Sequence, residues 1–362
     1  MPILKNDLIM KKLFLSLSLL ASLAFFNACT TDVELYADYK DIPVVYGLLD
    51  ASQDTNFIRI NRAFSGDNDH PINAANVALI ADSCNYPGKL DVRILRYKKG
   101  YGNEYVLDSQ APDSGIIILD TITIHDKEEG IFYSPNQKVY WTDKPLTINT
   151  ESAKYRYKIF VYKDNDTITS ETNIVGGDGF KIVTASLGFM ANENDLTSKV
   201  KFTLADNAVF YDMKMVFYYR ESVNGGPMTD KEVSYSFGVK AIDDLFQEND
   251  RVYYVNYGSN TLFNLLEEAI GGDTIINEAH PNVVRYFDEK PMKIFLSAGG
   301  DELYNYIQIN SQTGYAQSVP DYTNISGGYG VFSSRINLVK DVLISAATQR
   351  DLYGKPWGFV QQ

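Results

Sequence analysis

Short segments in which apolar and polar residues alternate account for most of the chain after residue 42. Within residues 55–64, Ile58 and Ile60 alternate with Arg59 and Asn61, so one face of the segment is apolar. Period-two alternation bounded by turn residues is typical of half-buried β-strands. The pattern predicts strands at 43–50, 55–64, 89–97, 115–124, 155–164, 166–175, 180–187, 199–206, 210–222, 231–239, 291–299 and 302–310.

Helical periodicity is confined to three segments. In residues 261–270 the side chains of Leu262, Leu265, Leu266 and Ile270 share one face, and Gly271 follows as a stop signal. Helices are also expected at 242–248 and 336–353.

Together these elements predict a mainly β protein of two parts. Residues 43–176 are expected to form an immunoglobulin- or fibronectin-like sandwich, because Tyr155 and Tyr157 open its penultimate strand as in such folds. The glycines at 176, 177 and 179 mark the boundary, and residues 177–362 are expected to form a larger β-rich domain with a few helical insertions.

The first 28 residues have the features of a signal peptide. Two lysines, at 11 and 12, precede an apolar run over 13–26, which is too short to span a bilayer. Ala28 and Cys29 follow, and Met10 is the expected true start, because residues 1–9 add nothing that a signal peptide needs. A small residue directly before a cysteine is similar to the bacterial lipobox, so Cys29 is predicted to be lipidated and to become the first mature residue.

Residues 29–42 then form a polar, acidic tether between the lipid and the first domain. Asp32 and Glu34 loosely resemble the acidic signal that sends Bacteroidota lipoproteins to the cell surface, so the surface is favoured over the periplasmic face of the outer membrane. If Cys29 carries lipid, Cys84 is left alone and no intramolecular disulfide forms.

The net charge of the chain argues against one class of binding partner, and its aromatic content favours β-structure. The chain has a formal net charge of −13, and removing residues 1–28, with three lysines and one aspartate, brings it to −15. Such a surface repels nucleic acid. The 26 Tyr and 19 Phe favour strands.

Catalytic signatures are missing from the sequence: it has no nucleophile elbow, no zinc-protease helix, no phosphate-binding loop and no dinucleotide-binding fingerprint. Asp67, Asp69 and His70 could hold a cation, but a solvated turn explains them better, so neither a metal nor a cofactor is expected. A glycosidase needs two carboxyl groups that face each other across a cleft, which a sequence cannot reveal. Exposed aromatic rings could instead bind sugars; the candidates are Tyr218, Tyr219, Tyr253, Tyr254 and Trp357, although packing in β cores explains most of them.

One motif stands out, in the segment YTNISGGYGVFSSR at residues 322–335. Its candidate residues are Asn324, Ile325, Gly327, Gly328, Gly330, Val331 and Phe332. The glycines allow positive φ or a close backbone approach, which predicts a tight turn that delivers Val331 and Phe332 into a core strand. A structural role is therefore favoured over a ligand site.

This motif, PVVYGLLD at 43–50 and RINRAFSG at 59–66 together resemble an uncharacterised family of Bacteroidota outer-membrane lipoproteins. Thr323 stands where many members have Ser. The resemblance spans nearly the whole mature chain and implies a cell-envelope lipoprotein, often encoded beside TonB-dependent transporters, with no catalytic residues to carry over. We therefore expect a non-enzymatic binding or accessory subunit of such a transporter or of another envelope protein. The alternative is a glycan-binding or glycan-processing surface lipoprotein of a polysaccharide-utilisation system.

Overall fold

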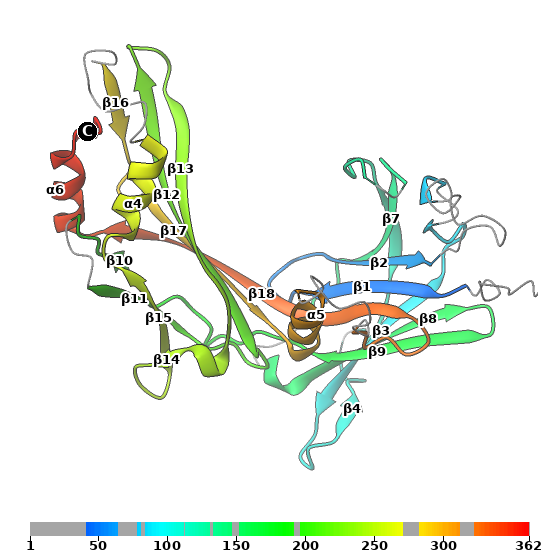
Figure 1. Ribbon diagram of the computed structural model, residues 1–362. Coiled ribbons are helices and arrows are strands. Elements are labelled where there is room, and N and C mark those ends of the chain that lie inside the picture. Colours follow the sequence, from blue (N-terminus) through cyan, green and yellow to red (C-terminus); the bar gives the residue numbers. More distant parts are fainter. Residues whose placement is uncertain are drawn as a thin grey trace, which may run out of the picture.

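The computed structural model describes residues 41–63, 78–80, 84–111, 113–130, 133–146, 152–191, 196–270, 282–311 and 322–361, and it is mainly β, as expected (Figure 1). The signal peptide, Cys29, almost all of the tether and the loop with Asp67, Asp69 and His70 lie outside these residues.

Two sheets enclose the first hydrophobic core. One contains, in spatial order, β1 (Pro43–Leu49), β2 (Asn56–Arg62), β7 (Gln137–Thr142) and β6 (Asp120–Ile124). The other contains β4 (Tyr105–Leu107), β3 (Asp91–Lys99), β8 (Tyr155–Lys163) and β9 (Asp166–Asn173), with β5 (Ile116–Ile118) also paired to β3. With the short β4 and β5 set aside, the remaining strands β1, β2, β3, β6, β7, β8 and β9 can be lettered A to G in chain order. The two sheets then have the orders A-B-E-D and C-F-G, which are those of an immunoglobulin-type sandwich. The immunoglobulin-like assignment stays a prediction, which this strand order supports.

The core between these sheets is built from the inward positions of the alternating strands. Val45, Ile58, Ile94 and Tyr157 are fully buried or nearly so, because neighbouring residues in a strand point to opposite faces. The larger second core begins after the first one along the chain: Ile174 belongs to the first core and Val175 to the second.

The second part combines a long twisted sheet, a small sheet and helices. The long sheet contains β13 (Thr229–Ala241), β12 (Phe210–Val223), β17 (Met292–Gly299) and β18 (Tyr329–Ile344), with β16 (Val283–Tyr286) and β10 (Ser186–Leu187) at its sides. The small sheet contains β11 (Thr197–Thr203), β15 (Val252–Gly258) and β14 (Phe246–Gln247). The described helices are α4 (Thr261–Ile270), α5 (Asp301–Ser311), α6 (Ala346–Gly354) and the 3-10 turns η2 (Ser152–Lys154) and η3 (Ile242–Asp244).

Strand β18 joins the two parts into one sheet. Its first half pairs in parallel with β1, from Tyr329 beside Val44 to Ser334 beside Leu49, and its second half pairs antiparallel with β17. Figure 1 shows β18 running from the sandwich to the far part, where the C-terminus lies. Ile325 and Phe332 consequently belong to the first core, although they lie within the predicted second domain. The residue limits 43–176 and 177–362 stay a prediction.

Several predicted elements differ from the structure. Residues 302–310 are not a strand but part of α5, whose first turn carries Asp301 and Glu302, where acidic side chains favour a helix N-terminus. The predicted helix over 336–353 is wrong in its first half, because residues 336–344 belong to β18, where 336–342 pair with β17 and 343–344 pair with β10. The predicted helix over 242–248 is only the short turn η3 followed by β14, and the strand over 180–187 shrinks to β10. Helix α4 is confirmed.

Candidate functional site

The glycines of the 322–335 motif bring β18 close to β1. Gly330 has φ +109°, and a Cβ there would lie 2.8 Å from the Val45 carbonyl carbon. A Cβ on Gly328 would lie 2.5 Å from the carbonyl oxygen of Pro43. Only glycine fits such positions.

Asn324 fixes the same turn through its side-chain amide. Its Oδ1 accepts a hydrogen bond from the Phe332 backbone N–H at 2.9 Å, and its Nδ2 donates to the Phe332 carbonyl at 2.7 Å. Ile325, Val331 and Phe332 are buried, and the Phe332 ring lies so close to Gly47 that a Cβ there would be 2.9 Å from it. The three segments that carry the family resemblance therefore meet in β2, β1, β18 and the turn before β18, and these contacts support the structural interpretation of the motif.

A shallow cavity of about 440 Å³ lies over β12, and another of about 500 Å³ lies beside the glycine turn. Gly327, Gly328 and Tyr329 line the second of these together with Lys163, whose Nζ is 3.0 Å from Asp41. Lys163, the one cation in the described lining of this cavity, is thus already paired with Asp41.

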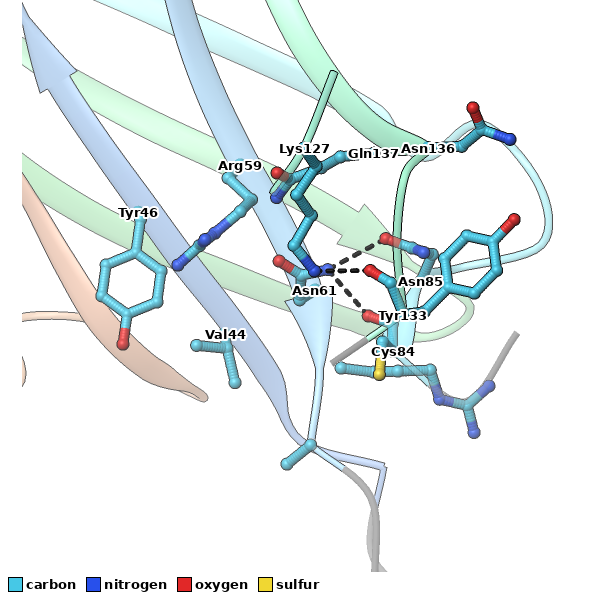
Figure 2. A pocket seen from close by; sticks show the side chains of 12 residues that line it. Val44, Tyr46, Arg59, Asn61, Cys84, Asn85, Lys127, Tyr133, Asn136 and Gln137 are labelled. Carbon is cyan, nitrogen blue, oxygen red and sulfur yellow. Dashed lines mark hydrogen bonds between the residues drawn. The ribbon is translucent and has the colours of Figure 1, made fainter. Parts of the chain in front are cut away.

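A more enclosed cavity of about 380 Å³ lies on the outer face of β1 and β2 (Figure 2). Tyr46, on β1, is paired directly with Arg59, on β2, so both side chains point away from the core on which Val45 and Ile60 lie. The Arg59 guanidinium lies over the Tyr46 ring, 4.6 Å from its centre. Among the described residues Arg59 makes no ion pair.

Polar contacts hold the opposite wall of this cavity. Figure 2 shows the Asn61 amide, which donates to the Cys84 carbonyl at 2.8 Å and to Asn85 Oδ1 at 2.9 Å. Lys127 donates to the Tyr133 carbonyl on the same side. Burial raises the pKa of the Cys84 thiol, which donates a hydrogen bond to the Ala78 carbonyl.

The enclosed cavity is basic, although the protein as a whole is strongly acidic. Arg59, Arg62 and Lys127 line it, and its described lining contains no carboxylate. Arg62 lies 3.4 Å from Asp41, which is outside the lining. Arg59 thus places in this cavity a positive charge that no described carboxylate pairs, on a chain of net charge −13.

A second, wider cavity of about 770 Å³ adjoins the first, since Tyr46, Arg59 and Gln137 line both. Helix α5 bounds it: the Tyr306 ring packs edge-on against Tyr46 at 6.2 Å. Its described carboxylate, Asp50, is buried and already accepts hydrogen bonds from Ser52 and Asn337. We call the two cavities together the cleft.

The opposite outer face of the sandwich carries exposed apolar side chains. Ile118 and Ile116 on β5 are 65% and 39% exposed, and Tyr162 on β8 is 39% exposed. The Phe160 ring lies nearly parallel to that of Tyr162, at 15° and 6.2 Å. Ile118, Arg93 and Phe160 are direct cross-strand partners, so these side chains share one face, which we call the β5–β8 face.

The aromatic residues proposed from the sequence for sugar binding do not form one platform. Tyr219 and Trp357 are buried in the second core, which supports the packing interpretation for them. Tyr254 stacks on exposed Phe246 in the small sheet, and Lys199 lies over its ring at 4.0 Å. Tyr218 lies elsewhere, below Lys293. Tyr46 and Arg59 were not among the residues predicted for a site. The one signal in the sequence is the alternation of Arg59 with Ile58 and Ile60, which predicts that the Arg59 side chain points outward.

Carboxylates line the cavity over β12, the cavity beside the glycine turn (Asp41 and Asp166) and the wider cavity (Asp50). The cavity over β12 is lined by Asp230, Glu232 and Asp288, of which Asp288 pairs with Arg220 at 2.9 Å. Glu302 lies between the sheets, where its carboxylate accepts hydrogen bonds from Thr172 and Ser333 and burial raises its pKa. In the described residues, no group of histidine, cysteine or acidic side chains is placed to hold a metal ion, and no helix is long and apolar enough to cross a membrane.

No protein-family model matches the chain, and no curated protein is significantly similar to it.

Proposed function

We propose that the chain is a non-enzymatic lipoprotein of the cell envelope, anchored to the outer membrane through Cys29, that acts as an accessory subunit of a transporter of the TonB-dependent type. The observation that carries the proposal is the β5–β8 face. Contiguous exposed apolar side chains on a folded domain are typical of surfaces that bind another protein. On this face Ile116 and Ile118 lie near Phe160 and Tyr162, with Arg93 of β3 between Ile118 and Phe160.

The place where the tether reaches the first strand is consistent with a partner in the membrane. Strand β1 begins at the end of the sandwich far from the second part (Figure 1). A fully extended tether over 30–42 reaches about 45 Å at roughly 3.5 Å per residue. A lipid on Cys29 would therefore hold the sandwich, and not the second part, next to a membrane-embedded partner.

The test is a pull-down of the native lipoprotein from detergent-solubilised outer membrane. We expect a stoichiometric transporter to be recovered, and Ile118→Asp to abolish recovery because it places a charge in an apolar interface. Val339→Asp is the matched control, since Val339 is similarly exposed but lies on β18 in the second part. Recovery of the lipoprotein alone would contradict the proposal.

The anchor needs its own test. Cys29→Ala should release the protein from the membrane fraction, and persistence there would show that the lipid is not what holds it. Glu232→Gln and Asp288→Asn should leave transporter binding intact. A hydrolytic activity that the parent protein shows and these variants lose would overturn the non-enzymatic assignment.

Glycan binding is the second candidate function. It is favoured by the cleft, in which aromatic rings, amide side chains and Arg59 surround connected cavities.

A further inference from the structure

We infer that the cleft is the binding site for an oligosaccharide that carries acidic groups, with Arg59 as the residue that recognises the charge. The inference does not depend on the proposed transporter, because the cleft and the β5–β8 face lie on opposite outer faces of the sandwich.

The charge of the ligand follows from the lining. Arg59 in the enclosed cavity and Arg335 in the wider one make no ion pair among the described residues. Arg62 and Lys127 also line the enclosed cavity, but Arg62 already pairs with Asp41 and Lys127 donates to the Tyr133 carbonyl. Because the rest of the protein is acidic, an anion would be repelled from most of the surface and attracted here. Arginine also binds carboxylate and sulfate groups through two parallel hydrogen bonds.

The Arg59 guanidinium is oriented by Tyr46 and keeps its N–H donors available for a carboxylate or sulfate group. Its guanidinium lies on the Tyr46 ring, a contact that fixes the plane of the group but uses none of its N–H donors. Since Arg59 lines both cavities, any ligand long enough to fill them must pass over it. The volumes, about 380 and 770 Å³, suit a ligand of a few sugar rings.

The lining favours a saccharide over an acidic peptide. An extended peptide binds most readily at a free strand edge, where it can add backbone hydrogen bonds. The cleft lies instead on the face of β1, which is already paired on both edges, with β2 and β18. What the cleft offers is side chains: the amide of Gln137, which can donate to and accept from hydroxyl groups, and the rings of Tyr46 and Tyr306.

The experiment is isothermal titration calorimetry on the full-length lipoprotein in detergent with four probes. These are trigalacturonate, a sulfated galactose trisaccharide, a neutral galactose trisaccharide and hexaglutamate. We expect at least one acidic trisaccharide to bind ten or more times tighter than the neutral one, and the better probe identifies the acidic group as carboxylate or sulfate. Arg59→Gln should weaken that binding at least tenfold, which corresponds to about 1.4 kcal/mol.

Lys199→Gln is the matched control, because it removes one charge from another cation stacked on a tyrosine, in the distant small sheet. It should leave the affinity unchanged. The inference is overturned if neither acidic trisaccharide binds at millimolar concentration, if the neutral sugar or hexaglutamate binds equally well, or if Arg59→Gln and Lys199→Gln behave alike. Arg59 is exposed, so a circular dichroism spectrum identical to that of the parent protein should confirm that each variant folds.

Discussion

Gly330→Ala should separate β18 from β1 and destabilise the protein more than alanine at a glycine that has open space around it. At φ +109° an alanine is strained by about 1–3 kcal/mol. Its Cβ would also overlap the Val45 carbonyl oxygen and lie 2.8 Å from the carbonyl carbon, whereas non-bonded carbons prefer about 3.5 Å, so the strands must move apart by more than roughly 0.7 Å. Weakening two ladder hydrogen bonds adds about 2 kcal/mol. The expected loss is about 3–5 kcal/mol.

Two other glycines separate these contributions. Gly238 has φ +69° in β13, but no atom lies within 4 Å of the position that a Cβ would take, so Gly238→Ala should cost only about 1–2 kcal/mol from backbone strain. Gly179 has neither a positive φ nor a neighbour within 4 Å, so Gly179→Ala should change stability by less than about 0.5 kcal/mol.

Urea denaturation followed by tryptophan fluorescence measures all three variants. The chain has two tryptophans, Trp141 in β7 and Trp357 in the second core, so each part contains a probe. Each glycine variant is also measured in proteins that carry Trp141→Phe or Trp357→Phe. The single remaining tryptophan then shows which part of the chain unfolds. If Gly330→Ala were no more destabilising than Gly238→Ala, the close approach of β18 to β1 would not be what requires glycine.

Three further predictions use the same assay. Asn324→Ala should cost about 2–3 kcal/mol, because it leaves the backbone N–H and C=O of buried Phe332 without partners; an unchanged midpoint would refute this. Since burial raises the pKa of Glu302 in the folded state, its ionisation disfavours folding as pH rises above 4.5; Glu302→Gln should therefore gain stability relative to the parent protein between pH 4 and pH 7, and a constant difference would contradict the shift. Arg285→Ala should cost about 3–5 kcal/mol, because it removes the close, buried partner of Glu221 and leaves that carboxylate only Lys231, at 3.8 Å; a loss below 1 kcal/mol would count against the Arg285–Glu221 pair.

Most of the strands were predictable from the sequence, whereas among the helices only α4 was. Residues 56–62 and 155–163 alternate cleanly because one face of each is buried in a core. Leu303 and Ile307, four residues apart, share one face in a helix and also in a strand, so local pattern could not decide in favour of α5. The ring contacts of Tyr306 with Tyr46 and of Tyr304 with Phe210 show how the helix packs.

The candidate site lay beyond local pattern for a different reason. Tyr46 and Arg59 are ordinary outward positions of two strands, and their neighbours in the cleft come from segments as distant as Lys127 and Asn337. The glycine motif was easier to interpret, because a cluster of glycines has few explanations other than positive φ or a close approach. Its partner Val45, however, is about 285 residues earlier in the chain, a separation that periodicity cannot bridge.

The shared strand explains why the cleft is not a property of the sandwich alone. The hydrogen bonds of β18 continue without a break from β1 to β17, so the two cores cannot rotate relative to each other unless the sheet loses its register. Buried polar contacts reinforce the junction: Asn337, on β18, bonds both Asp50 after β1 and Ser297 on β17. Because Tyr306 and Arg335 line the wider cavity opposite Tyr46, the ligand site is assembled from both parts of the chain. A ligand in the cleft would therefore stabilise that junction, since it binds only the form in which both walls are in place.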